Sequence, residues 1–186
     1  LKDKVGSEYI DKAENYWLDD VRQFATDAMM SLIKEDLASL GIEMDNFFSE
    51  KSLYGVGKIE EAIENLKSKN LIYEGVLDPP KGKKVEDWEP RVQTLFKSTL
   101  HGDDVDRPIK KSDGAWTYFA PDIAYHFDKV DRKFDQLIDV FGADHGGYVK
   151  RMKAAVSALS NDEVKFDIKL TQLVKLFKNG EPRSEE

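Results

Sequence analysis

The chain has 186 residues and carries 36 Asp and Glu against 28 Lys and Arg, which gives a formal net charge of −8. The acidic balance disfavours the broad basic face with which proteins hold long nucleic acids. The sequence contains no cysteine, which excludes disulfides and thiolate metal sites and favours a cytoplasmic location. No apolar run approaches the roughly 20 residues of a membrane helix, so no membrane partner is expected.

A helical repeat of apolar residues covers residues 11–40. The apolar side chains recur at steps of three and four, which places them on one face of a helix. The members of this face are Trp17, Val21, Phe24, Ala28, Leu32, Ile33, Leu37 and Leu40. Gly41 is suited to end the helix, because glycine accepts the left-handed backbone there. Met29 and Met30 are interpreted as core residues of this helix.

A second helix is predicted over residues 58–69, with Ile59, Ala62, Ile63 and Leu66 on its buried side, and residues 71–74 read as a strand. Residues 78–84, with the sequence DPPKGKK, are typical of a loop. Lysines in such a turn are more often solvated than bound to a phosphate, and we interpret them as solvated.

Strands and helices alternate after Trp88. Strands are predicted over residues 94–98, 116–119 and 137–141, followed by a helix over 148–159. This alternation favours an α/β fold with a largely parallel sheet. We therefore expect a mainly helical region over 1–84 and an α/β region over 85–186.

The first candidate site is the segment TYFAPDIAYH, residues 117–126. Tyr118 is predicted at the C-terminal end of a strand, where ligands bind in open α/β sheets. Pro121 favours a helix start, which puts Asp122 in the first turn. A carboxylate there suits a guanidinium, whose fork matches its two oxygens. The alternative is that Asp122 only complements the helix dipole.

The second candidate site is the segment LIDVFGADHGGY, residues 137–148, in which a strand enters a glycine-flanked turn. Gly142 lets a nucleotide approach the backbone, and Asp144 is suited to accept hydrogen bonds from ribose hydroxyls. His145 is suited to donate to a phosphate near the helix N-terminus. The alternative is an ordinary tight turn with Asp144 as the N-cap.

Metal and covalent chemistry find little support in the sequence. Its histidines, His101, His126 and His145, lack zinc-binding spacing. The acidic residues of 103–106 favour a solvated turn over a magnesium site, because magnesium usually borrows substrate phosphates. There is neither a cysteine nor a G-x-S-x-G elbow for nucleophilic catalysis. We therefore predict no protein-held metal and assign no catalytic residue.

Taken in order, several segments resemble the arginyl-tRNA synthetase family in its bacterial form. The resemblance covers most of the chain, and its most specific runs are SDG-x-x-TY-x-x-x-DIAYH and GADHGGY-x-x-R. Other matching runs are LGIEMDNFFSE, IYEGVLDPPKGK and LTQLVKLFKNGEP.

The resemblance implies the second half of a Rossmann-type parallel-sheet catalytic domain over 85–186, preceded by a helical insertion or connecting region. It further implies a class I ligase that activates L-arginine with ATP, accompanied by Mg²⁺, and transfers it to tRNA(Arg). Tyr118 and Asp122 would bind L-arginine. Gly142, Asp144 and His145 would contact ATP.

The family's HIGH motif and KMSKS-type loop do not occur in this sequence. Both stabilise the transferring phosphate, so the chain is expected to be an incomplete catalytic fragment that is inactive alone. The alternative is a non-catalytic module derived from a synthetase that contacts tRNA or protein. A generic adenine-nucleotide domain is a third reading, but it leaves the spacing of Tyr118 and Asp122 unexplained.

Overall fold

The computed structural model describes residues 5–77, 91–172, 174–175, 177–178 and 180–182. The chain forms two compact units, Leu1–Phe48 and Ser49–Glu186. We predicted a division after Lys84, but the elements just before that residue pack with later ones and share their core. The role of region 1–84 as a connecting insertion stays a prediction, and the expected loop at 78–84 lies outside the described residues.

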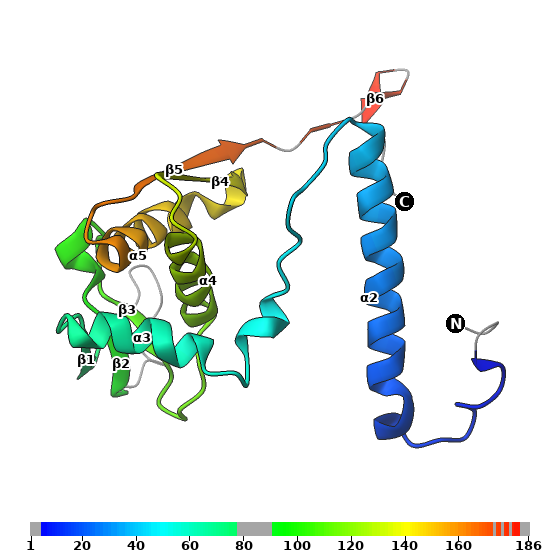
Figure 1. Cartoon of the computed structure of the whole chain (residues 1–186), viewed down its shortest axis with the longest axis horizontal. Coiled ribbons are helices and arrows are strands. Elements are labelled where there is room, and N and C mark those ends of the chain that lie inside the picture. Colours follow the sequence, from blue (N-terminus) through cyan, green and yellow to red (C-terminus); the bar gives the residue numbers. More distant parts are fainter. Residues whose placement is uncertain (1–4, 78–90, 173, 176, 179, 183–186) are drawn as a thin grey trace. The chain divides into compact units, whose positions relative to one another are not determined.

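The first unit contains the helix α2, Glu14–Ser39 (Figure 1), which confirms the long N-terminal helix. Its end has the Schellman pattern: the amide of Gly41 donates to the carbonyl of Ala38, and that of Ile42 donates to Leu37. Gly41 has a φ of +72°, so glycine avoids the steric cost that other residues meet there.

The expected burial of the apolar face of α2 is wrong for this structure. No α2 residue is buried, and Met29, predicted to be a core residue, is 55% exposed. Apart from the single helical residue Val5, the described part of this unit contains no helix or strand besides α2. Periodicity gives a helix its apolar face, but burial of the face requires a neighbour.

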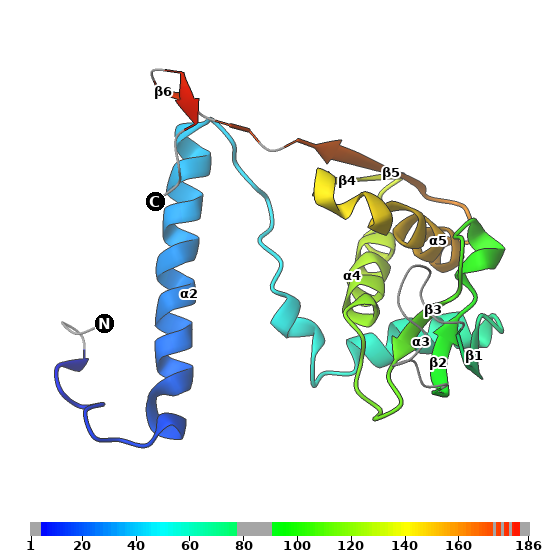
Figure 2. The same ribbon diagram turned by 180° about the vertical axis from the view of Figure 1, so that it is seen from behind.

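The second unit begins with the short 3₁₀ helix η1, Glu50–Leu53, and the helix α3, Lys58–Ser68. The predicted inward residues of α3 are all buried: Ile59, Ala62, Ile63 and Leu66. This face packs mainly on α4, Phe119–Asp131, and also contacts α5, Val149–Ser160. These three helices lie next to one another (Figure 2), and their buried residues form the core together with Leu95, Phe96 and Ile109 of the strands described next.

A three-stranded antiparallel sheet follows α3. It consists of β1 (Ile72–Gly75), β2 (Gln93–Phe96) and β3 (Arg107–Lys110), in that order. The 3₁₀ helix η3, Ser98–His101, joins the last two strands. The predicted strands near 71 and 94 are thereby confirmed, but their antiparallel pairing differs from the largely parallel sheet that we expected.

The predicted strand over residues 116–119 is wrong. Trp116 makes a single bridge to Lys110, and the amide of Thr117 donates to Ile109, so pairing with β3 lasts only briefly. The amide of Ala120 then donates to the carbonyl of Thr117, because the chain is already turning into α4. Helix initiation therefore ends the strand pairing within two residues.

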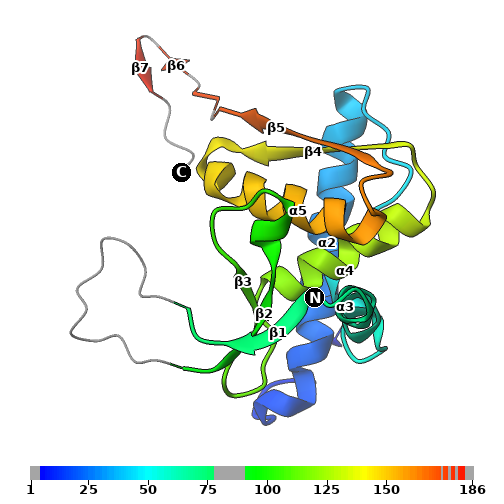
Figure 3. The same ribbon diagram turned by 90° about the vertical axis from the view of Figure 1, so that its left-hand side faces the viewer.

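A parallel pair of strands completes the second unit (Figure 3). The strand β4, Gln136–Gly142, leads through the 3₁₀ turn η4, Ala143–Tyr148, into α5 and then to β5, Lys165–Thr171. The strands run in register from Gln136 opposite Lys165 to Gly142 opposite Thr171. This β–α–β unit is the parallel α/β element predicted from the sequence, and a small hairpin of β6 (Phe177–Lys178) and β7 (Glu181–Pro182) follows it.

Within the described residues, no helix combines the length and the apolar character needed to cross a membrane.

The buried face of α3 provides a test of the helical core. Leu66 is fully buried, so Leu66→Ala should lower the free energy of unfolding of the chain by about 2–5 kcal/mol through the cavity it leaves. Chemical denaturation measures this. Leu100→Ala is the matched control, because Leu100 is 69% exposed and its truncation should change stability by less than about 0.5 kcal/mol. Equal effects of the two changes would contradict the described packing.

Candidate functional site

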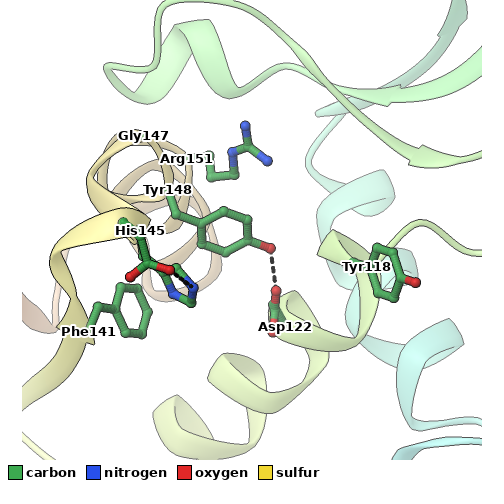
Figure 4. Close-up of a pocket in the computed structure, with 8 residues that line it drawn as sticks. Tyr118, Asp122, Phe141, His145, Gly147, Tyr148 and Arg151 are labelled. Carbon is green, nitrogen blue, oxygen red and sulfur yellow. Dashed lines mark hydrogen bonds and ion pairs between the residues drawn. The ribbon is translucent and has the colours of Figure 1, made fainter. Parts of the chain in front are cut away.

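A pocket of about 640 Å³ opens where α4 begins and β4 ends, a volume in the range of small-molecule sites (Figure 4). Side chains from three consecutive parts of the fold line it. The start of α4 contributes Tyr118 and Asp122, and α5 contributes Arg151; Phe141, Asp144, His145, Gly147 and Tyr148 come from the end of β4 and from η4.

Asp122 lies in the first turn of α4, as predicted, and is partly buried. The hydroxyl of Tyr148 donates a hydrogen bond to its Oδ2 (Figure 4). Burial raises the pKa of Asp122 above its ordinary 3.8, and the hydrogen bond from Tyr148 only partly offsets this effect. Burial and the neighbouring carboxylate also raise the pKa of Tyr148, which therefore stays a donor.

Aromatic contacts fix the ring of Tyr148. Phe119 meets it edge-on, with ring centroids 6.1 Å apart and an interplanar angle of 86°. Phe141 packs against it with a centroid distance of 6.5 Å. Such tilted arrangements suit the charge distribution of aromatic rings. The hydroxyl therefore reaches Asp122 from a ring that is held on two sides.

Tyr118 immediately precedes α4 instead of ending a strand, which corrects its predicted setting. It lines the pocket, yet it is 90% exposed, and its hydroxyl points away from Asp122 in the view of Figure 4. The strand that was expected to carry it ends at the bridge of Trp116. Tyr118 thus lies beside Asp122 without contacting it.

The glycine-flanked turn has the predicted strand-to-helix position. A Cβ on Gly142 would lie 2.5 Å from Oδ1 of Asp144, so that carboxylate lies across the space that a side chain at Gly142 would take. Asp144 is exposed and provides no side-chain cap to the turn, which argues against its alternative role as an N-cap. His145 is also exposed, with Nε2 3.5 Å from Oδ2 of Asp144 and its ring against Phe141.

A buried polar network lies directly behind Asp122. Nδ1 of His126 is 2.8 Å from the carbonyl oxygen of Asp122, and Nε2 is 2.8 Å from Oδ2 of Asp139. Both partner atoms are acceptors, so each ring nitrogen that carries a proton can donate to its partner. Nζ of Lys129 donates to Oδ1 of Asp139 at 2.7 Å.

Asp139 is the anionic centre of this network and is only 7% exposed. Burial by itself raises its pKa, but the hydrogen bonds and charges of His126 and Lys129 outweigh burial and hold the pKa below its ordinary value. Asp139 belongs to the predicted strand over residues 137–141 and His126 to the first candidate segment, but no role was predicted for either residue. Their pairing was missed because it joins β4 to α4, 13 residues apart.

The acidic run 103–106 is only partly a solvated turn, because Asp104 is exposed whereas Asp103 is buried. Asp103 is 7% exposed, and its carboxylate accepts hydrogen bonds from Nε and Nη2 of Arg107, at 2.6 and 2.7 Å. Asp106 accepts hydrogen bonds from Tyr73 and Thr99. In the described part of the chain, no cluster of His, Asp or Glu is suited to hold a metal ion.

The fold brings most of the predicted residues to one place. Tyr118, Asp122, Asp144 and His145 all line the pocket, and Gly142 directly precedes the turn that forms one wall. Tyr148 and Arg151 also line it but were not predicted as site residues. Both occur in the GGY-x-x-R run. Their three-residue spacing at the start of a helix places them on the same face, and this was the sequence signal that could have identified them.

The chain was compared with known proteins. No protein-family model matches it. It is 76% identical over 182 residues to an arginine–tRNA ligase of Roseobacter denitrificans and 74% identical over 181 residues to one of Ruegeria sp. TM1040. These alignments cover 98% and 97% of this chain but only 31% of each relative.

The fold gives the same result. A crystal structure from Campylobacter jejuni, assigned as an arginyl-tRNA synthetase, superposes with a TM-score of 0.78 at 34% identity. The superposition covers 98% of this chain and 36% of that one. The resemblance to the arginyl-tRNA synthetase family is confirmed, and the chain spans about a third of the length of the curated relatives it matches.

The buried network gives a stability prediction. Asp139→Asn should cost the chain about 3–5 kcal/mol of unfolding free energy, because His126 and Lys129 lose their shared anion. Denaturation at neutral pH measures the loss. Asp131→Asn is the control, since the Asp131 side chain is 73% exposed and its pair with Lys133 lies at the surface. A loss no greater than that of the control would reject the network.

The same network predicts an acid dependence. The folded pKa of Asp139 lies below its unfolded value, so its contribution to stability is present above the ordinary carboxyl pKa of 3.8 and disappears as pH falls through the lowered folded pKa. Wild-type stability should therefore fall more steeply in acid than that of Asp139→Asn. Parallel curves for the two proteins would contradict this assignment.

Proposed function

We propose that this chain is part of an arginine–tRNA ligase, in which ATP activates L-arginine to arginyl-adenylate and the arginyl group passes to tRNA(Arg). The observation that carries the proposal is the partly buried carboxylate of Asp122 in the pocket wall. The high identity to arginine–tRNA ligases supports it independently. Because the chain spans about 31% of those relatives, it contributes only part of the activity.

The chemistry of Asp122 fits a guanidinium. No Lys or Arg in the described part of the chain forms an ion pair with this carboxylate, and burial raises its pKa. The hydroxyl of Tyr148 donates to Oδ2 of Asp122, so Oδ1 is the oxygen that can accept a hydrogen bond from a ligand. A substrate guanidinium would donate to Oδ1 and supply the missing positive charge. Asp122 would then recognise the arginine side chain, with Tyr118 beside it.

The turn at the end of β4 is proposed to hold the nucleotide. Asp144 and His145 are exposed on the pocket wall, where a carboxylate can accept from ribose hydroxyls and an imidazole can donate to a phosphate. The space that a side chain at Gly142 would fill is taken by the carboxylate of Asp144, which glycine therefore allows to lie close to the backbone. Mg²⁺ would arrive with the phosphates of ATP.

In the proposed reaction, a carboxylate oxygen of arginine attacks the α-phosphorus of ATP, and pyrophosphate leaves. A hydroxyl of the terminal ribose of tRNA then attacks the activated carbonyl carbon, and AMP leaves. This chain contributes positioning, since it holds the guanidinium at Asp122 and the adenosine side at the turn. The HIGH and KMSKS-type motifs, which stabilise the transferring phosphate in the family, do not occur in its sequence, so it is proposed to be inactive alone.

Arginine recognition can be tested on this chain by calorimetry with L-arginine and L-citrulline. Citrulline is nearly isosteric but has an uncharged ureido group. We expect wild-type protein to prefer arginine by at least about tenfold, because a charge-assisted hydrogen bond contributes roughly 1.5–3 kcal/mol. Asp122→Asn should remove the preference, whereas Asp128→Asn, on the same helix but outside the pocket lining, should retain it. Equal affinities for both ligands in the wild type would sink the assignment of Asp122.

Arginine binding should also depend on pH. The guanidinium stays protonated, whereas Asp122 must be ionised to pair with it. Because burial raises the pKa of Asp122, affinity should begin to fall at a pH above that expected for an ordinary carboxyl of pKa 3.8. Titrations at several pH values measure this.

Asp122→Asn serves as the control for that series and should bind with little pH dependence over the same range. A raised folded pKa means that the ionised carboxylate costs stability as pH rises, so the variant should be no less stable than wild type at neutral pH. Affinity that falls only below the ordinary carboxyl range would contradict the predicted role of burial.

A further inference from the structure

Arg151 presents a positive charge at the pocket that the proposed arginine contact does not use. It lies in the first turn of α5 and lines the pocket together with Asp122 and Tyr148. Its guanidinium carbon lies 4.7 Å from the centroid of the Tyr148 ring. Its Nε is buried without a hydrogen-bond partner, and across the described ranges Arg151 forms no ion pair with a carboxylate.

The neighbouring charges do not neutralise Arg151. Asp103, whose charge also acts on Arg151, is engaged by Nε and Nη2 of Arg107. Burial lowers the pKa of Arg151, and the positive charge of Arg107 lowers it further. The carboxylate of Asp103 is thus already occupied by Arg107 beside an open pocket. An incoming anion would compensate for the cost of burying the guanidinium of Arg151 and would offset its repulsion from Arg107.

Tyr148 separates this positive charge from the negative one. Its hydroxyl donates to Asp122, while the guanidinium of Arg151 lies over its ring in a cation–π contact (Figure 4). The pocket therefore offers an anion and a cation on two sides of one fixed aromatic side chain. A ligand with a cation at one end and an oxyanion at the other matches this arrangement.

We propose that Arg151 binds an oxyanion of the substrate, a carboxylate or a phosphate, while Asp122 binds the guanidinium of the same reaction complex. This inference rests on the proposed function and deepens it by adding the residue that receives negative charge. The α-carboxylate of arginine and the phosphates of ATP share the required chemistry. The side chain of Arg151 suits either anion, because the planar guanidinium can donate two parallel hydrogen bonds to neighbouring oxygens.

A purely structural role for Arg151 makes a different prediction. A cation over an aromatic ring contributes about 0.5–1 kcal/mol at exposed sites and serves packing alone. Its loss would then alter stability without changing the choice between ligands that differ only in an oxyanion. Ligand preference therefore separates binding from packing.

The experiment compares paired ligands on the whole chain by calorimetry. Agmatine is arginine without its α-carboxylate, and adenosine is ATP without its phosphates. The variants are Arg151→Gln, which removes the charge and keeps hydrogen-bonding capacity, and Arg151→Lys, which keeps the charge without the fork. Lys153→Gln is the matched control, since it removes one positive charge from the same helix at a side chain that is 48% exposed and pairs with Asp167.

We expect wild-type protein and Lys153→Gln to prefer at least one oxyanion-bearing ligand over its partner by about tenfold or more. Arg151→Gln should abolish that preference, and Arg151→Lys should restore part of it. Loss of the arginine-over-agmatine preference identifies the carboxylate as the anion. Loss of the ATP-over-adenosine preference identifies a phosphate.

The proposal is overturned if Arg151→Gln keeps every preference of the wild type, or if the wild type shows neither preference. The arginine–citrulline comparison separates this failure from that of the proposed function, because it depends on Asp122 and should persist in Arg151→Gln. If Arg151→Gln still prefers arginine over citrulline and its preferences for the oxyanion-bearing ligands are unchanged, the proposed role of Asp122 stands and only that of Arg151 is rejected. Amide spectra of each variant confirm that the fold is unchanged.

Discussion

The hydrogen bond from the hydroxyl of Tyr148 to the carboxylate of Asp122 links the two segments that form the pocket. One end belongs to the first turn of α4 and the other to the turn that leads into α5, 26 residues later. A second link between α4 and β4 runs through His126 and Lys129 to Asp139, deeper in the fold. The bond also decides which oxygen of Asp122 remains open, and it holds the aromatic ring that carries Arg151.

The network behind this contact makes the site rigid. His126 receives its orientation from the carbonyl of Asp122 and from Asp139, so α4 is tied to β4 through a side chain at each end. Lys129 adds an ammonium group to Asp139 from the next helical turn. The buried carboxylate therefore has a hydrogen-bond partner at each oxygen, and its removal would leave the charge of Lys129 uncompensated. These contacts hold α4 and β4, which carry the site, in a defined position relative to each other.

Charge is distributed across the pocket in a way that suits an amino acid and a nucleotide. A partly buried carboxylate lies on one side, a guanidinium on the other, and an exposed Asp–His pair beside a glycine-flanked turn. Each group has an incomplete set of partners for its charge or polarity among the described residues around it. Binding sites commonly have this property, because groups that are fully satisfied within the protein have little to offer a ligand. The proposed arginine and ATP contacts use these groups.

The sequence alone determined the local elements and the family. Periodicity gave the buried face of α3 residue by residue, glycine gave the end of α2, and the paired motifs gave the resemblance that the comparisons confirmed. Only the tertiary structure decided the rest. It turned the expected strand before Tyr118 into the approach to a helix, and it brought His126, Asp139, Tyr148 and Arg151 around Asp122. The physical reason is that helix period, caps and turns depend on residues a few positions apart, whereas burial, charge pairing and pKa shifts depend on neighbours that are distant along the chain.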